Sequence, residues 1–99
     1  MDIAIDDLKV EHNIGARRFE IHYGDEMARL EYQLRGPTIV YTHTVVPKAL
    51  ERHGIAGRLA RAALDYARNR GLSVVPLCPY VADYIEKHPE YEDLIARED

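Results

Sequence analysis

A change of hydrophobic period near the middle of the chain constrains the fold more than any other sequence feature. Residues 38–46 form an extended segment rich in β-branched residues, and Pro47 interrupts it. A short loop containing Gly54 and Gly57 follows, after which apolar residues return at helical spacing up to Arg70. The sequence therefore predicts a strand, a glycine-bearing loop and a long amphipathic helix in direct succession.

The predicted helix ends at a glycine and is followed by another strand. Gly71 is expected to be the C-terminal cap, and residues 73–77 read as a short apolar strand. A strand on each side of one helix predicts a right-handed crossover, so the strand at 73–77 should pair in parallel with the strand at 38–46. The helix face expected to pack on the sheet comprises Ile55, Leu59, Ala62, Ala63, Tyr66 and Ala67.

Shorter strands are predicted before this unit and short helices after it. Apolar and polar residues alternate from Leu8 to Tyr23, with a turn at residues 13–15, and again from Leu30 to Leu34. With the strand at 38–46, these segments should form an antiparallel meander. Two short helices, Tyr80 to His88 and Glu90 to Arg97, are expected after Pro79, separated at Pro89. The predicted architecture is α+β: a mainly antiparallel sheet with one parallel strand pair, one long helix and a helical C-terminal tail.

Composition limits the classes of protein to which the chain can belong. Its 99 residues suffice for one domain, expected to span 1–99. No apolar run approaches the roughly 20 residues needed to cross a bilayer, and the start MDIAIDDLK lacks an export signal, so a cytoplasmic protein without a membrane partner is expected. Cys78 is the single cysteine, which agrees with a reducing compartment.

Charge and histidine spacing argue against two further classes. The net charge of −4 disfavours nucleic-acid binding, and the helix arginines 58, 61, 68 and 70 read as a solvated face partly paired with Asp65. None of the histidines shows the spacing of metal ligands, so no metal site is expected.

The loop before the helix predicts a site for a phosphate group. The first turn of a helix leaves backbone N–H groups without partners, and the helix dipole makes that end partly positive. Glycines there let an anion approach the backbone closely. The run E-x-x-G-x-A, formed by Glu51, Gly54 and Ala56, resembles the Q/R-x-x-G-x-G/A signature of the GNAT superfamily of acetyl-CoA-dependent N-acetyltransferases. Together with HGIAGRLARAALDYAR and PLCPYVADYIEKHPEY, it resembles a small single-domain GNAT-like subfamily over residues 8–92.

This resemblance implies how a cofactor would bind. Acetyl-CoA would be the acyl donor, with its pantetheine arm paired to the backbone of Val45 and Val46. Glu51 replaces the usual Gln or Arg, and because a carboxylate repels a diphosphate it is expected to point away or to cap the helix. The pyrophosphate loop would be formed by Arg52, His53, Gly54, Ile55, Ala56 and Gly57.

Three side chains are candidates for the chemistry of acetyl transfer. The resemblance places Tyr84 where the family often has the acid that protonates the leaving thiolate, although an aromatic core anchor would look the same. His43, on the strand before the cofactor-pairing residues, is a candidate base or else an ordinary packed or surface histidine. Cys78 ends the neighbouring strand and is either a nucleophile brought close to His43 or a small buried apolar residue.

Three functions are therefore open. The leading one is an N-acetyltransferase that transfers an acetyl group to an unidentified amine, as a monomer or weak homodimer. The alternative is a non-catalytic acyl-CoA-binding or sensing module, since a small chain leaves little surface for an acceptor pocket. A partner-binding domain that has lost the cofactor is the third, and Glu51 is its main support.

Overall fold

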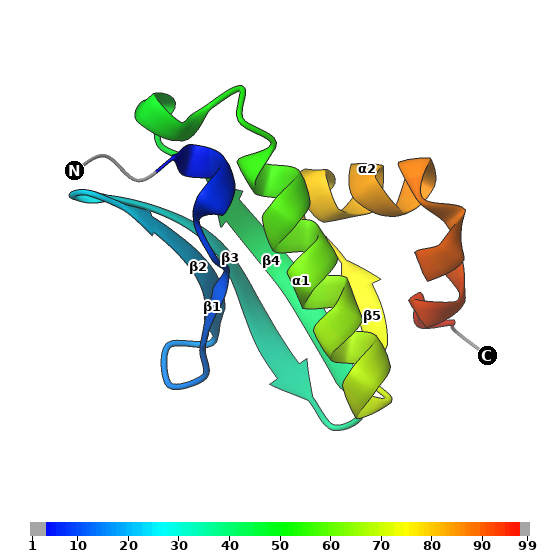
Figure 1. The fold of residues 1–99 in the computed structure, drawn as a ribbon. Coiled ribbons are helices and arrows are strands. Elements are labelled where there is room, and N and C mark those ends of the chain that lie inside the picture. Colours follow the sequence, from blue (N-terminus) through cyan, green and yellow to red (C-terminus); the bar gives the residue numbers. More distant parts are fainter. Residues whose placement is uncertain (1–3, 98–99) are drawn as a thin grey trace.

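A five-stranded sheet forms the centre of the computed structural model, which describes residues 4–97 (Figure 1). The strands lie in chain order from β1 to β5; β1 to β4 pair antiparallel, and β4 pairs in parallel with β5. The strands are β1 (Glu11–Asn13), β2 (Arg18–Tyr23), β3 (Glu26–Arg35), β4 (Thr38–Val45) and β5 (Ser73–Pro76). The helices are η1 (Ile5–Asp7), η2 (Lys48–Leu50), α1 (Ile55–Arg70), α2 (Pro79–Lys87) and η3 (Pro89–Leu94), where η marks a 3₁₀ helix. The predicted meander, parallel pair and α+β class are confirmed.

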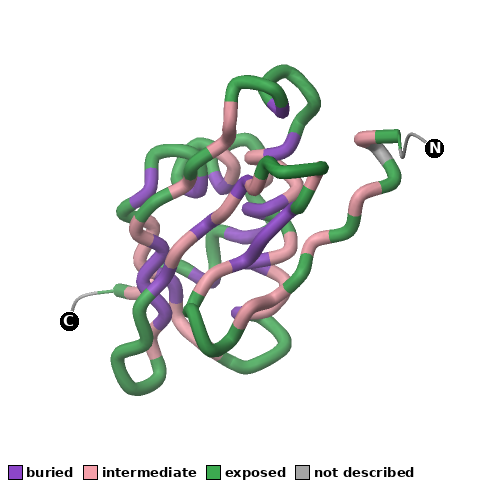
Figure 2. The backbone as a smooth tube through the Cα atoms, turned by 90° about the vertical axis from the view of Figure 1, so that its left-hand side faces the viewer, coloured by how far each residue is buried: buried purple, intermediate pink, exposed green. Residues whose placement is uncertain are grey.

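One face of the sheet packs against α1, and this contact forms the core. Alternate residues of the inner strands point toward the helix, and Tyr41 donates a hydrogen bond from its hydroxyl to the Ala63 carbonyl. Gly71 caps α1 in the left-handed conformation, as predicted. Figure 2 shows buried positions gathered in the middle of the molecule and exposed ones at the hairpin tips. The buried residues of α1 are Ile55, Leu59, Ala60, Ala63, Leu64 and Ala67, while Ala62 and Tyr66 of the predicted face are only half-buried.

The opposite face of the sheet carries a polar network around Glu20, which is only 6% exposed. Arg18 donates to its carboxylate, as do Asn13 at 3.0 Å and His22 Nε2 at 2.8 Å. The hydrogen bond from Arg18 is the main reason that the pKa of Glu20 falls to about 2; burial opposes it, and His22 and Asn13 support it. The buried carboxylate is therefore ionised and held by partners on its own and the neighbouring strand.

The two ends of the chain depart from the sequence-based expectation. The first strand begins at Glu11 rather than Leu8, and η1 precedes it. Arg58 of α1 donates to the carbonyl oxygens of Ile5, at 3.0 Å, and Leu8, so it is not part of a solvated face. The expectation drawn from the start MDIAIDDLK concerns residues 1–3 as well, and these three lie outside the described residues.

The predicted last helix is also shorter than expected. It is the 3₁₀ helix η3, which stops at Leu94 instead of running to Arg97. Ile95 then forms a parallel bridge with Val74, and the Ala96 amide donates to the Val74 carbonyl at 2.8 Å. The prediction was wrong here because the backbone gains sheet hydrogen bonds at the free edge of β5 that continued helix would forgo.

No helix in the described part of the chain combines enough length with enough apolar character to cross a lipid bilayer.

The Glu20 network predicts a pH-dependent contribution to stability. A carboxylate whose pKa is depressed in the folded state stabilises the fold above its unfolded pKa and loses that contribution as pH falls toward the folded value. Glu20→Gln should lower the free energy of unfolding by roughly 1–3 kcal/mol at pH 7. Urea unfolding from neutral pH down to about pH 2 should show the two proteins converging below about pH 4.5. A deficit that stays constant with pH, or an equal one for exposed Glu26→Gln, would contradict this account.

Candidate functional site

The two parallel strands separate at one end, and this separation defines the candidate site. Their pairing runs from Thr38 opposite Ser73 to Tyr41 opposite Pro76. The Cys78 amide still donates to the Tyr41 carbonyl at 3.0 Å, but the chain then turns into α2 at Pro79. Strand β4 continues to Val45. Its last residues therefore keep β3 on one side and have no β5 partner on the other.

A β-bulge in β4 accompanies this separation. Tyr32 of β3 lies opposite Tyr41, whereas Glu31 lies opposite His43, so Thr42 is an extra residue in β4. Bulges bend a strand and shift which side chains face which side of the sheet. As a result, Thr44 lies opposite the buried Leu30 on the core face, and His43 and Val45 point to the other face.

The loop before α1 presents a row of backbone amides. Arg52 and Gly54 both adopt the left-handed conformation, with φ of 67° and 69°, and Gly54 is the N-cap of α1. The first hydrogen bond of the helix runs from the Arg58 amide to the Gly54 carbonyl at 3.0 Å. Within residues 4–97, the amides of residues 52–57 have no hydrogen-bond acceptor. Such a row of donors at a helix N-terminus is suited to an anion.

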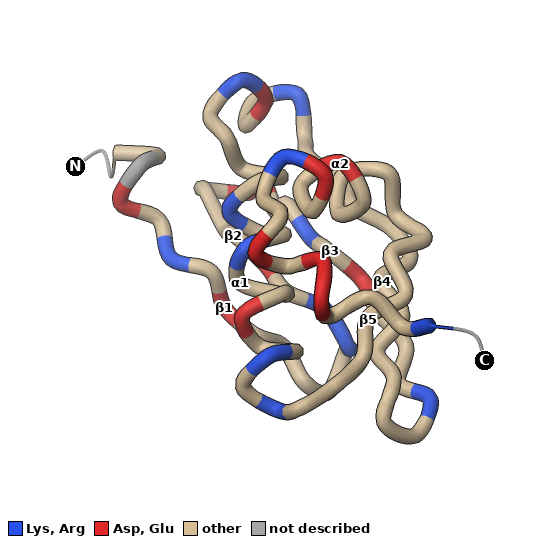
Figure 3. Tube along the Cα trace, turned by 90° about the vertical axis from the view of Figure 1, so that its right-hand side faces the viewer, with Lys and Arg blue, Asp and Glu red and all other residues tan. Residues whose placement is uncertain are grey.

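A pocket of about 170 Å³ lies against this loop. Val46 borders it where β4 ends, and Tyr80 borders it from the first turn of α2. Figure 3 shows basic and acidic positions next to each other on this loop, and Glu51 and Arg52 are the pair that borders the pocket. The remaining lining residues are Leu50, Gly54, Ile55, Ala56 and Gly57.

Most of the predicted cofactor-binding residues therefore border one pocket. Val46, Arg52, Gly54, Ile55, Ala56 and Gly57 line it, whereas Val45 and His53 are exposed beside it in the chain. Of the two alternatives expected for Glu51, capping of α1 is ruled out, because Gly54 occupies the N-cap position and no side chain bonds there. Glu51 is exposed at the pocket rim, where its flexible side chain can extend into water.

Cys78 is completely buried directly before α2. Its Sγ lies 2.9 Å from Thr44 Oγ1, and this contact joins the diverging strands on their core face. His43 is the neighbour of Thr44 in β4 and points to the opposite face, where it is exposed. The structure therefore does not bring His43 and Cys78 together.

Tyr84 contacts the beginning of α1. A Cβ added at Gly57 would lie 3.7 Å from Tyr84 Cε2, so the ring packs on the helix where the amides are exposed. The ring also stacks on His88, with centroids 3.9 Å apart. Burial is the main cause that raises the pKa of the Tyr84 hydroxyl, which keeps it protonated at neutral pH.

Sequence reasoning missed two residues of this site. Tyr80 is 55% exposed although it is large and apolar, and it closes one side of the pocket. The sequence signal that could have identified Tyr80 was its position directly after Pro79, the proline expected to precede a helix. Thr44, the partner of Cys78, could not be found from the sequence because the bulge at Thr42 decides which face it occupies.

Comparisons with known proteins agree with this geometry. A family model described as GCN5-related N-acetyl-transferase matches residues 18–94. Protein NATD1 of Mus musculus is 35% identical over 85 residues, covering 83% of this chain and 77% of the mouse protein. Protein NATD1 of Danio rerio is 33% identical over 93 residues, covering 89% and 84%. The NMR structure of a GCN5-like protein from Staphylococcus aureus superposes with a TM-score of 0.71 at 23% identity, covering 94% of this chain and 92% of that one. The chain therefore belongs to the GCN5-related N-acetyltransferase family.

Proposed function

We propose that the protein is an acetyl-CoA-dependent N-acetyltransferase. The observation that carries this proposal is the pocket at the start of α1, where the unbonded amides of residues 52–57 meet the open end of the β4–β5 pair. The pocket offers backbone amides to an anion and an unpaired strand edge to an extended chain. Acetyl-CoA matches both features, because it has a diphosphate and a linear pantetheine arm that ends in the thioester.

The diphosphate would bind at the loop. Its oxygens would accept hydrogen bonds from the amides of residues 52–57, aided by the positive end of the α1 dipole. Arg52 adds a guanidinium at the pocket. The left-handed backbone at Arg52 and Gly54 changes the direction of successive peptide groups, which fits amides that surround an anion.

The pantetheine arm would run along the end of β4. Beyond Tyr41, this strand has one edge without a β5 partner, so the peptide groups near Val45 and Val46 can pair with the amides of the arm. Val45 is 39% exposed, and Val46 lines the pocket. The arm would thereby carry the thioester from the loop toward the point at which β4 and β5 separate.

The transfer needs a proton acceptor and a proton donor. The amine nitrogen attacks the thioester carbonyl, the C–N bond forms, the C–S bond breaks, and coenzyme A leaves as its thiol. His43 is our candidate base, because it is exposed on the open face and can take the amine proton. Tyr84 is our candidate acid, because its ring packs on Gly57 at the start of α1 beside the proposed diphosphate site and its phenol carries a proton at neutral pH.

We propose direct transfer, with Cys78 as a packing residue. The Cys78 side chain is fully buried and its sulfur contacts Thr44, whereas His43 faces the other side of the sheet. An activated cysteine nucleophile needs access and a nearby base. The arrangement supports attack by the amine on the thioester itself rather than through an acetyl-cysteine.

A coenzyme A-binding or sensing module is the second candidate. It needs only the loop amides and the open edge of β4, because a site that binds without turnover requires no catalytic base or acid. Both candidates require acetyl-CoA to bind at residues 45–57. Release of coenzyme A thiol in the presence of a panel of amines separates them, because a sensing module would bind without release.

Binding at the loop can be tested by removing one amide. Ala56→Pro deletes a donor in the first turn of α1, where proline is tolerated and no intrahelical bond is lost. Because a hydrogen bond to a charged group contributes about 1.5–3 kcal/mol, affinity for acetyl-CoA should fall at least about tenfold. Isothermal titration measures the affinity and circular dichroism checks the fold. Ala56→Ser keeps the amide and should bind like the parent; equal affinities for all three proteins would refute the loop as the diphosphate site.

The catalytic assignments predict different kinetic effects. Tyr84→Phe and His43→Gln should each lower kcat about 100-fold with little change in the KM for acetyl-CoA, since general acid and base groups contribute that much. The Cys78→Ala variant should retain nearly the parental rate. Thiol release with a responsive amine measures all three, and Tyr23→Phe on β2 is the control. Two results together would contradict direct transfer: the Cys78→Ala variant loses turnover, and the parental protein becomes acetylated when no amine is added. They would show that the acetyl group passes through Cys78.

A further inference from the structure

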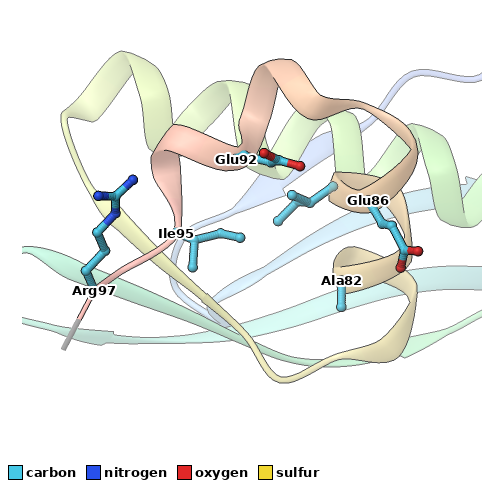
Figure 4. Close-up of a pocket in the computed structure, with 6 residues that line it drawn as sticks. Ala82, Glu86, Glu92, Ile95 and Arg97 are labelled. Carbon is cyan, nitrogen blue, oxygen red and sulfur yellow. The ribbon is translucent and has the colours of Figure 1, made fainter.

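A second cavity, larger than the loop pocket, lies between α2, η3 and the last residues of the described chain (Figure 4). Its volume is about 420 Å³, within the range of roughly 300–1,000 Å³ found for small-molecule sites. No role in cofactor binding falls on any of its residues. They are Ala82, Ile85, Glu86, Glu92, Ile95 and Arg97.

The charged groups of this cavity are separated along its length. Figure 4 shows Arg97 at one end, Ala82 and Glu86 at the other, and Ile95 between them. Ile85 adds a second apolar wall, because it is 2% exposed and belongs to the core. The cavity therefore has a basic end and an acidic end, and between them lie the apolar Ile85 and Ile95 together with the carboxylate of Glu92.

Neighbouring charges on the same elements are already paired. Lys87 lies 3.1 Å from Asp83 on α2, and Arg68 of α1 lies 2.9 Å from Asp93 on η3. By contrast, no ion pair within residues 4–97 includes Glu86, Glu92 or Arg97. These three groups are available to a ligand that carries both signs of charge.

The acidic end is also the end nearest the proposed transfer site. The Ala82 amide donates to the Cys78 carbonyl at 3.0 Å, so Ala82 stands one helical turn beyond the point where β4 and β5 separate. A turn of α-helix advances about 5.4 Å, and Glu86 lies one turn further along α2. Along the helix axis, Ala82 therefore lies about one turn and Glu86 about two turns, roughly 11 Å, from the strand separation, so the amine must bind beside Ala82 to reach a thioester there.

We infer that this cavity binds the acetyl acceptor, and that the acceptor is an aliphatic primary amine with a carboxylate at its other end. The inference rests on the proposed acetyltransferase function. Arg97 binds the carboxylate, Ile85 and Ile95 contact the aliphatic chain, and Glu86 attracts the ammonium group to the end near Ala82. The amine loses its proton before it attacks the thioester, so Glu86 acts in binding and positioning.

The test uses ε-aminocaproate as the probe, with hexylamine and caproate as analogues that each lack one charged group. Added to the full chain, ε-aminocaproate should give saturable NMR shifts at the amides of residues 82–86 and 92–97, and both analogues should bind about tenfold more weakly. Arg97→Gln should weaken the binding of ε-aminocaproate about tenfold without altering that of hexylamine. Arg35→Gln, an exposed substitution at the end of β3, is the matched control and should bind like the parent.

Turnover supplies the second measurement. With acetyl-CoA present, Arg97→Gln should raise the KM for ε-aminocaproate about tenfold and leave kcat nearly unchanged, because Arg97 is remote from the reacting nitrogen. Absence of saturable shifts, equal binding of hexylamine and ε-aminocaproate, or binding of the probe without its acetylation would each overturn the inference. Release of coenzyme A thiol is measured in parallel with a panel of other amines. Release with those amines but not with ε-aminocaproate refutes the acceptor site alone, whereas no release with any amine refutes the proposed function.

Discussion

The parallel pairing of β4 with β5 is the constraint on which the rest of the structure depends. Four residue pairs join the strands, from Thr38 with Ser73 to Tyr41 with Pro76, and α1 must cross from one strand to the other over a single face of the sheet. The crossover fixes where α1 begins, and the early end of the pairing fixes where the sheet can open. The loop amides and the free edge of β4 thus come together because one short strand stops at Pro76.

The candidate site includes features that are costly for an unliganded fold. Arg52 adopts a left-handed conformation that costs a residue with a side chain about 1–2 kcal/mol, and the amides of residues 52–57 gain nothing from protein acceptors in the described chain. The buried core beneath the loop, including Leu50 and Ile55, holds the backbone in this state. A bound diphosphate would offset that cost, because its oxygens would satisfy donors that are already correctly placed.

The sequence was sufficient for the architecture because each element had a local cause. The period of two in β2 and β3, the helical spacing after Gly54 and the glycine at 71 all acted within a few residues. The loop residues could be identified for the same reason. The face on which His43 lies relative to Cys78 could not, since the extra residue Thr42 shifts the alternation of β4, and a bulge leaves no periodic signal. Nor could the end of η3 be foreseen, because it depends on a pairing with Val74 that is distant in the sequence.

That pairing has a consequence for how the protein behaves at high concentration. An unprotected β5 would offer Val74 and its neighbours as a template for a strand from another molecule, and short apolar strands at sheet edges are common starting points of such contacts. Ile95 and Ala96 occupy part of this edge from within the chain. At the far edge, β1 is only three residues long and begins with a charged residue, Glu11. The segment after η3 and the short strand β1 together act against intermolecular sheet growth, which makes solubility depend on residues remote from the candidate site.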